Sequence, residues 1–514
     1  MSRSRELALV TVLALVWAAI ITWLGWLRVQ TFQSPEFEDE ALYHQMLWAV
    51  GQGTPFENTI HPLHRPSHWS PVTLLVWPLY AAFSQLGSPH VAVALVQALA
   101  LASGAFVVRL LVRAVANATP ADVFRWVTVY LLFPPTLALA LSPYRPLLLA
   151  VPALLLVGYG VVSRRLGLTL LGFGAAVVCR EDLALVALPL ALVAWLRHRD
   201  LRFVLWPLGL ALAWYLVVTR AVLPAILPAG YEAIVVQSNL ATDGVGALLA
   251  RPFERTHLVA LLLLVVPLLG LPVLAWESLL GATGVAAIAL YKGGFAMNVV
   301  HFATPAVPAV LVGAIVAWGR HRKQRPWLGA AVLGAVLLTH AQPWLPPVFA
   351  TDEAHNGAPD ATLPGVGTWS PFAPARFQPD VTGRWELLAL IPPDAPVAAV
   401  GHLLPALSPR ARLFELGHAD TPFLDVTWVA LEARHLYRGA GDYLAFDPPA
   451  AVCALAALRG AFHVERASGD LTLLRRAAEP ANVRVLEAQV RACRPQRATS
   501  PDARRGVRSP GASR

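Results

Sequence analysis

Long apolar runs follow one another through the first two-thirds of the chain, separated by short polar stretches. A helix needs about 17 to 25 mostly apolar residues to cross a bilayer, and the pattern predicts about eleven such helices. These predicted helices lie at residues 7–27, 90–113, 122–141, 146–162, 166–179, 183–197, 203–220, 256–275, 276–291, 299–318 and 326–342. Several are short or contain Pro, which membrane helices tolerate when neighbouring helices or a cavity satisfy the freed backbone groups. The sequence therefore predicts an all-α polytopic membrane domain over residues 1–342.

The first apolar run, residues 7–27, resembles both a signal peptide and a membrane helix. It is longer than the apolar core of a signal peptide and has no small-residue cleavage site. We therefore expect it to be retained as a membrane anchor.

Charged residues between the predicted helices indicate the orientation, because cytoplasmic loops are enriched in Lys and Arg. With the N-terminus inside, the basic residues of the inner loops are Arg3, Arg5, Arg109, Arg113, Arg125, Arg164, Arg165, Arg197, Arg199, Arg202, Arg320, Arg322, Lys323 and Arg325. The acids of the outer loops are Glu36, Glu38, Asp39, Glu40, Glu57, Glu181, Asp182, Glu232, Asp243 and Glu254. This arrangement requires the apolar run at residues 72–86 not to cross. We interpret it as a helix at the outer membrane interface within outer loop 28–89, anchored by Trp69, Trp77 and Tyr80.

Residues beyond the last predicted helix are expected on the outer side, because an odd number of crossings precedes them. Residues 343–380 are rich in Pro and are predicted to form a linker. In residues 381–480, the pattern predicts short strands at 396–400, 424–429 and 471–474, and a helix at 449–458. Strands and a helix mixed in this way indicate a small exported α/β domain. Residues 481–514 are predicted to hold a helix end and a disordered Arg-rich tail.

Composition supports a membrane protein and limits its partners. The chain is 56% hydrophobic and 14% charged, with a mean hydropathy of +0.56. The formal net charge is +9, but six Arg and one Asp in residues 494–514 supply much of it. A nucleic-acid-binding protein needs basic charge on a folded face, so we expect no nucleic-acid partner. Cys179, Cys453 and Cys493 lack metal-ligand spacing and cannot all pair, so neither a zinc site nor a disulfide framework is predicted.

The acidic stretch after the first predicted helix is a candidate for catalysis. Four of the five residues 36–40 are acids, and Asp39 and Glu40 directly precede a predicted helix. One interpretation is a solvated loop in which one acid caps that helix. The other is a carboxylate at the lip of a membrane cavity that acts as a general base. His68, later in the same loop, could orient a substrate or ligate a metal, or could only be hydrogen-bonded.

Charged residues at predicted outer helix ends are candidates for binding a substrate or a lipid phosphate. Arg180 precedes Glu181 and Asp182 between two apolar helices, where charges are costly unless they face one another or a wet cavity. The group is either an ion pair that locks the helices together or a phosphate site built on the planar fork of Arg180. Arg145 and Lys292 could bind phosphate or simply extend to headgroups. His301 could bind substrate or cap its helix.

Several short motifs, in order, resemble an uncharacterised family of bacterial membrane proteins, domain of unknown function 2079. They are Asp39 to Trp48 (DEALYHQMLW), Gly51 to Gly53, His68 to Pro71, Pro78 to Tyr80, Arg180 to Asp182, His301 to Ala303 with Pro305 and Pro308, Ile391 to Ala395, and Leu407 to Arg410. The resemblance covers roughly residues 30–475. That family is similar to the GT-C superfamily of membrane glycosyltransferases, which use polyprenyl-phosphate-linked sugars on the outer face of the membrane.

The resemblance implies an acid in the first outer loop as catalytic base, here Asp39 with Glu40 as its substitute. It also implies a His-Pro element opening an interfacial helix, here His68 to Pro71, and a basic residue near the lipid phosphate, here Arg180. The chain departs from the expected pattern at residues 142–146, where Arg145 stands in place of a His.

The apolar pattern thus predicts a helical bundle in the inner (plasma) membrane followed by an exported α/β domain, and the resemblance implies that the bundle is GT-C-like. The expected activity is inverting transfer of a sugar from a polyprenyl phosphate to an acceptor on the outer (periplasmic or extracellular) face of the membrane, with the lipid-linked sugar and membrane lipid as partners. No cofactor is indicated with certainty; the acids at 36–40 with His68 could bind a divalent metal, but their spacing does not identify one. The alternatives are a non-catalytic binder or transporter of lipid-linked sugars and an assembly factor for envelope polysaccharide.

Overall fold

The computed structural model describes residues 2–32, 37–60, 69–115, 118–226, 261–290, 304–321, 325–340, 381–416, 425–432, 461–469 and 471–477. The chain divides into two compact units. The first comprises residues 1–355, 359–381 and 402–411, and the second comprises residues 356–358, 382–401 and 412–514. The domain boundaries expected from the sequence, at residues 342, 380 and 480, stay a prediction.

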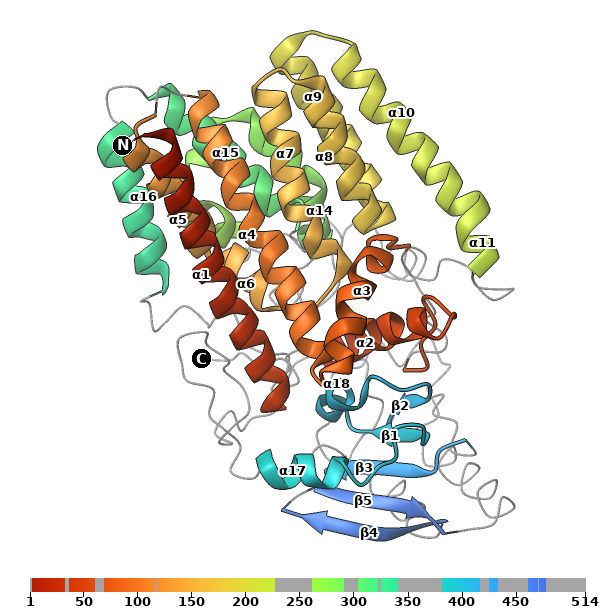
Figure 1. Cartoon of the computed structure of the whole chain (residues 1–514). Helices are drawn as coiled ribbons and strands as arrows, with labels where there is room; N and C mark the ends of the chain where they lie inside the picture. The colour runs from red at the N-terminus through yellow and green to blue at the C-terminus, as the bar shows by residue number, and fades with distance from the viewer. Residues whose placement is uncertain are drawn as a thin grey trace, which may run out of the picture. The chain divides into compact units, whose positions relative to one another are not determined.

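The first unit is helical (Figure 1). Its α-helices are α1 (Arg3–Gln30), α2 (Phe37–Gly51), α3 (Val72–Gln85), α4 (Pro89–Val115), α5 (Pro120–Leu132), α6 (Pro134–Leu141), α7 (Ala150–Val162), α8 (Leu166–Cys179), α9 (Ala187–His198), α10 (Arg202–Val217), α11 (Leu223–Ile226), α14 (Ala282–Leu290), α15 (Ala306–Arg320), α16 (Arg325–His340) and α18 (Leu404–Leu407). Tighter or wider turns are η2 (Pro146–Leu149), η3 (Glu181–Val186), η4 (Val218–Val222), η6 (Val266–Leu268), η7 (Leu271–Leu274) and η8 (Trp276–Gly281). The run at residues 72–86, expected at the membrane interface, forms the separate helix α3.

Three helices in the described part of the chain are long and apolar enough to cross a membrane: α1, α4 and the continuous stretch Arg202–Ala225. A fourth is present if α5 and α6, bent by 49° relative to each other, count as one broken span. Two consecutive prolines open α6 and lack the N–H groups that would continue α5. Most other predicted spans occur as shorter apolar helices or as helices that open with a 3-10 turn, so the number of eleven stays a prediction.

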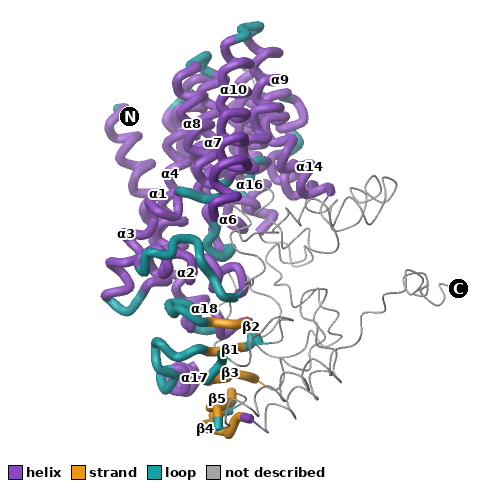
Figure 2. The backbone as a smooth tube through the Cα atoms, turned by 90° about the vertical axis from the view of Figure 1, so that its right-hand side faces the viewer, coloured by secondary structure: helices purple, strands orange, loops and turns teal. Residues whose placement is uncertain are grey.

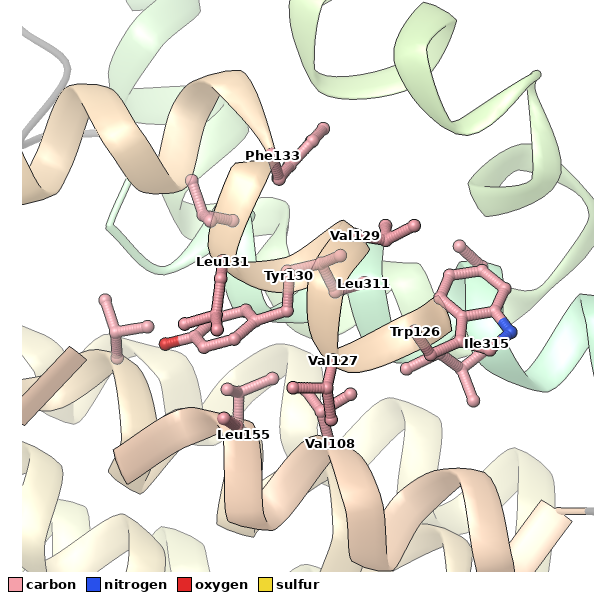
Figure 3. Packing of buried hydrophobic residues seen from close by; sticks show 14 of the residues in the cluster. Val108, Trp126, Val127, Val129, Tyr130, Leu131, Phe133, Leu155, Leu311 and Ile315 are labelled. Atoms are coloured by element: carbon pink, nitrogen blue, oxygen red, sulfur yellow. The ribbon is translucent and has the colours of Figure 1, made fainter. Parts of the chain in front are cut away.

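The core of the first unit lies around α4, which packs against α1, α5 and α7. Figure 3 shows Trp126 and Tyr130 of α5 within this core. The ring of Trp126 meets Trp318 of α15 edge to face, with centroids 5.7 Å apart. Gly104 leaves room for Tyr130, since a Cβ at Gly104 would lie 2.2 Å from the phenol oxygen. The described helices are therefore fixed by close packing as well as by their apolar surfaces.

Two ends of this helical unit can be defined by the contacts of its helix termini. Glu6 at the start of α1 binds Arg113 near the end of α4, and Val115 at the end of α4 lies beside Gly319 near the end of α15. Glu277 of η8 joins the ends of α9 and α15. We call this the Glu277 end. The opposite end, called the Asp39 end, holds the end of α1, the whole of α2, the start of α4 and the ends of α6 and α8.

The second unit contains α17 (Val381–Leu388) and one five-stranded sheet in the order β2-β1-β3-β5-β4 (Figures 1 and 2). Its strands are β1 (Val397–Ala399), β2 (Leu413–Glu415), β3 (Trp428–Glu432), β4 (Phe462–Ser468) and β5 (Leu471–Arg476). The strand β1 is parallel to β2 and β3, whereas β5 is antiparallel to β3 and β4.

Buried apolar runs identify part of this sheet from the sequence. The strands β1 and β5 coincide with the predicted runs at 396–400 and 471–474, and β3 overlaps the run at 424–429. The sequence analysis did not predict β2 or β4; β4 is mostly exposed, so its residues form no apolar run. The predicted helix at 449–458 and the tail lie outside the described residues.

Candidate functional site

Asp39 lies in the first turn of α2 and is held by a buried arginine. The Nε atom of Arg145 donates to Oδ2 of Asp39 at 3.0 Å, and Nη2 of Arg145 donates to the same oxygen. The side chain of Asp39 is 43% exposed, whereas that of Arg145 is 5% exposed. A carboxylate in the first turn also meets the positive end of the helix dipole. Asp39 is thus an accessible acid whose direction is fixed by the buried Arg145.

Arg145 reaches Asp39 from the turn between α6 and η2. The backbone of Arg145 is extended, with φ −141° and ψ 135°, and Pro143 and Pro146 flank the turn. Proline fixes its own φ and restricts the residue before it to extended conformations. The sequence of residues 142–146 therefore explains why this turn is extended and where Arg145 stands.

Tyr43, one helical turn after Asp39, lies within the electrostatic reach of both Arg145 and Arg180. Burial raises the pKa of Tyr43 to about 12, and the charge of Asp39 contributes to this shift. The positive charges of Arg145 and Arg180 act on the same phenol in the opposite direction, and Glu181 raises the pKa further. Four charged residues from three segments of the chain, Asp39, Arg145, Arg180 and Glu181, are therefore near enough to act on one tyrosine.

Arg180 follows the last residue of α8 and forms a two-pronged ion pair with Asp182. Its Nε donates to Oδ1 of Asp182 at 2.6 Å, and its Nη2 donates to Oδ2. Here again the arginine is buried, at 9% exposure, and the acid is exposed, at 37%. Glu181 accepts a hydrogen bond of 2.8 Å from the backbone N–H of Trp69. The ion pair is the arrangement that the sequence left open as an alternative to a phosphate site.

Glu40 differs from its neighbour Asp39 because it is buried. It accepts a hydrogen bond of 3.1 Å from Nη2 of Arg28, near the end of α1, and Arg28 is buried as well. One turn further, His44 lies 3.1 Å from His90 between ring nitrogens. Burial lowers the pKa of His44 well below its usual value, with further lowering by His90 and Arg28. Glu40 is therefore one of a group of buried polar residues on and next to α2, the others being Arg28, His44 and His90.

The structure places four of the seven candidate residues and brings three of them together. Asp39, Arg145 and Arg180 act on Tyr43, whereas Glu40 faces Arg28. The other candidates, His68, Lys292 and His301, lie outside the described residues. The sequence analysis missed Arg28 and Tyr43. Because α2 begins at Phe37 and not after Glu40 as predicted, Asp39 and Tyr43 lie four residues apart on one helix, a spacing that could have indicated Tyr43.

The described acids of α2 do not form a metal site. Asp39 and Glu40 each bind an arginine, and no group of three or more His, Cys, Asp or Glu side chains in the described ranges could hold a metal ion.

Solved structures that are similar to this chain include two of the Archaeoglobus fulgidus oligosaccharyltransferase. The one tethered to an acceptor peptide containing the NVT sequon has a TM-score of 0.40 and 12% identity, and the match covers 93% of this chain and 74% of that chain. The complex with Zn and sulfate has a TM-score of 0.33 and 14% identity, covering 89% and 72%. Neither likeness is close enough to establish a shared fold.

No curated protein matches the chain. The model of one family, described as "Predicted membrane protein (DUF2079)", matches residues 28–440. This match covers most of the sequence. It includes the end of α1, the candidate residues Asp39, Arg145 and Arg180, and the strands β1, β2 and β3. The chain therefore belongs to the DUF2079 family of predicted membrane proteins.

Proposed function

We propose that this protein is a membrane glycosyltransferase that moves a sugar from a polyprenyl phosphate to an acceptor on the outer face of the membrane. The observation that supports the proposal most is the accessible carboxylate of Asp39, fixed by buried Arg145, with Arg180 near enough to act on the same tyrosine. An exposed, oriented acid close to buried cations can accept a proton from one group while the cations stabilise an anionic leaving group.

Asp39 is the general base in this proposal. Both bonds from Arg145 go to Oδ2, so we assign Oδ1 to the acceptor hydroxyl. As the acceptor oxygen bonds to the anomeric carbon, its proton passes to Asp39, and the bond from that carbon to the phosphate oxygen breaks with its electron pair remaining on the phosphate. A single displacement of this kind inverts the anomeric centre. General base catalysis of this kind contributes about 10²- to 10⁴-fold.

Arg180 stabilises the departing phosphate. We assign its buried guanidinium, which also holds Asp182 through Nε and Nη2, to the phosphate. A delocalised guanidinium holds two anions at once better than an ammonium, because its donors point in several fixed directions. We also assign Arg145 to the proposed donor site. Three further candidates for this site lie outside the described residues: His68, Lys292 and His301.

The distribution of charge supports the proposed orientation. The basic residues Arg109, Arg113, Arg197 and Arg320 lie at the Glu277 end, opposite the candidate site. Loops rich in Arg face the cytoplasm, so this arrangement favours a plasma-membrane protein whose N-terminus is cytoplasmic. The candidate site is then on the outer side.

A non-catalytic binder of lipid-linked sugars is the second candidate function. The observation that favours it is that the exposed acids Asp39 and Asp182 already have arginine partners. Such a site can hold a phosphate or a sugar without any proton transfer. It predicts donor binding without release of the lipid phosphate.

The test is to incubate the purified protein in proteoliposomes with a panel of polyprenyl-phosphate sugars and to follow free polyprenyl phosphate. We expect release with at least one donor, and loss of release in Asp39→Asn. Asp200→Asn is the matched control, because Asp200 also pairs with an arginine, Arg202, but lies at the Glu277 end between α9 and α10. Binding of a donor without release would support the non-catalytic candidate and contradict the proposal.

A further inference from the structure

The end of α6 lacks backbone donors for its last carbonyl groups. The last four C=O groups of an α-helix have no partners within the helix. The N–H of Ser142 reaches the carbonyl of Ala138 at 2.9 Å. The next residue is Pro143, which has no N–H to give. The carbonyls of Leu139, Ala140 and Leu141 therefore depend on side chains.

Gln97, in the third turn of α4, supplies part of the missing donors, and the hydroxyl of Ser142 donates to the carbonyl of Leu139 at 2.8 Å. The Nε2 of Gln97 lies 3.2 Å from the carbonyl oxygens of both Leu139 and Ala140, and 2.9 Å from that of Ser142. Arg28 of α1 completes the cap with a bond from Nη1 to the carbonyl of Leu141. Two helices of the bundle thus hold the end of a third.

A buried amide in an apolar helix needs a reason. Gln97 is buried within a helix that is otherwise apolar enough to cross a membrane. Burying such a group is costly unless it is hydrogen-bonded. The bonds to α6 are what makes the residue tolerable at this depth, and they fix the chain three residues before Arg145.

We propose that Gln97 is a positioning residue of the candidate site: by capping α6 it holds the turn 142–146 so that Arg145 reaches Asp39. Its catalytic meaning rests on the proposed function. Arg28 supports the same geometry from the other side, because it binds both Leu141 at the end of α6 and Glu40 beside Asp39. This assigns Glu40 to the support of the site and leaves Asp39 as the base.

The first experiment measures geometry and needs no activity. In the double variant Asp39→Cys with Arg145→Cys, a short thiol-to-thiol cross-linking reagent reports how often the turn presents position 145 to position 39. The ion pair is absent from this variant, so the cap on α6 is what keeps the two positions close. The cross-linked peptide pair is identified by mass spectrometry, which separates it from products of the three native cysteines.

Gln97→Met is introduced into this double variant, because Met fills a similar volume and donates no hydrogen bond. We expect the rate of cross-linking to fall several-fold. The matched control is Gln85→Met, at an exposed glutamine in the last turn of α3, which should leave the rate unchanged. If Gln97→Met is too unstable to purify, Gln97→Asn keeps the amide one methylene shorter and should give an intermediate rate. An unchanged rate in both Gln97 variants would overturn the proposal.

The second experiment measures sugar transfer in the single variant Gln97→Met. Misplacing Arg145 and Asp39 should lower kcat by about one to two orders of magnitude while KM for the lipid-linked sugar changes little, since small misplacements are felt mainly in the transition state. An effect on stability alone, with kcat per folded protein unchanged, would contradict the positioning role. If the wild-type protein transfers no sugar but cross-linking depends on Gln97, the proposed function fails and the positioning role stands.

Discussion

Both ends of the helical unit have ion pairs between Arg and an acid, but the buried partner differs between the two ends. At the Glu277 end the acid is buried and the arginines reach the surface: Glu277 is 0% exposed, whereas Arg320 is 45% exposed. Glu6 lies under Arg113 in the same manner. At the Asp39 end the order is reversed, with buried Arg145 beneath exposed Asp39.

We interpret a buried acid as a tie between helix ends, and an exposed acid on a buried arginine as an accessible group held in a fixed direction. A buried acid covered by long cations ties helix ends together, because removing the arginines leaves an unpaired charge in the interior. An exposed acid on a buried cation keeps its oxygen available and its direction fixed. Glu40 with Arg28 is buried on both sides, so it follows the first rule although it lies at the Asp39 end. The exposure of the two acids therefore favours Asp39 over Glu40 as the proposed base.

The largest expected effect on stability is at the Glu277 end. Glu277→Gln leaves Arg197 and Arg320 without the charge of their shared acid, and we expect the free energy of unfolding to fall by about 2 kcal/mol, as for lost hydrogen bonds between charged groups. Thermal unfolding in detergent measures the loss. The control is Glu57→Gln at an exposed position, which should have little effect. An equally small loss in both variants would remove the anchoring role.

A smaller but specific effect is expected from lengthening the base. Asp39→Glu retains the charge and can retain a pair with Arg145, but moves the carboxylate by one methylene. Transfer should fall by about 30- to 100-fold, because catalysis depends on placement within a fraction of an ångström, while thermal unfolding stays unchanged. The measurement is kcat/KM for release of polyprenyl phosphate. Full activity in Asp39→Glu would mean that the fixed direction of Asp39 does not matter.

Arg180→Lys tests the second pair of the Asp39 end. Lysine keeps the positive charge and loses the planar fork, so it cannot hold Asp182 at two points and a phosphate at a third. We expect affinity for a polyprenyl-phosphate sugar to fall about tenfold. Arg202→Lys, in the exposed pair with Asp200, is the control and should bind normally. Unchanged donor affinity in Arg180→Lys would make the pair with Asp182 purely structural.

The smallest expected effect is a dependence of stability on acid. The pKa of His44 is lowered in the folded protein by burial, and by His90 and Arg28, so its imidazole is neutral when folded. The unfolded chain has an ordinary pKa of about 6.5 and takes up a proton below it. The contribution of His44 is therefore complete above that pH, and the free energy of unfolding falls as the pH is lowered further.

His44→Asn should remove part of this acid dependence, which thermal unfolding at about pH 7.5 and about pH 5.5 would measure. The control is His463→Asn, at an exposed histidine of β4 in the second unit. Identical pH profiles for the wild type and His44→Asn would show that another group is responsible.

The sequence predicts those parts of the structure that depend on apolar periodicity. The helices α1 and α4 are long, apolar runs, and the strands β1 and β5 lie within apolar runs of the second unit. The acidic start of α2 was identified as a candidate because four acids beside a membrane helix are conspicuous.

The contacts that make the candidate site could not be predicted in the same way. Asp39 and Arg145 are 106 positions apart, and Arg145 could equally have extended to a headgroup. Arg28 stood at the end of an apolar run and Gln97 within one, where local pattern gives no partner. Burial decides the roles of Asp39 and Glu40, and neighbouring acids in a sequence do not reveal which one is covered.

The most direct test of the account compares both kinds of acid in one experiment. Initial rates of polyprenyl phosphate release, per mole of folded protein, are measured for Asp39→Asn and Glu277→Gln beside the wild type, with thermal unfolding of each. We predict that Asp39→Asn loses release and keeps its stability, whereas Glu277→Gln loses stability and its folded fraction keeps the wild-type rate. Wild-type release by Asp39→Asn, with Glu40→Gln added to exclude substitution by that acid, would contradict the account.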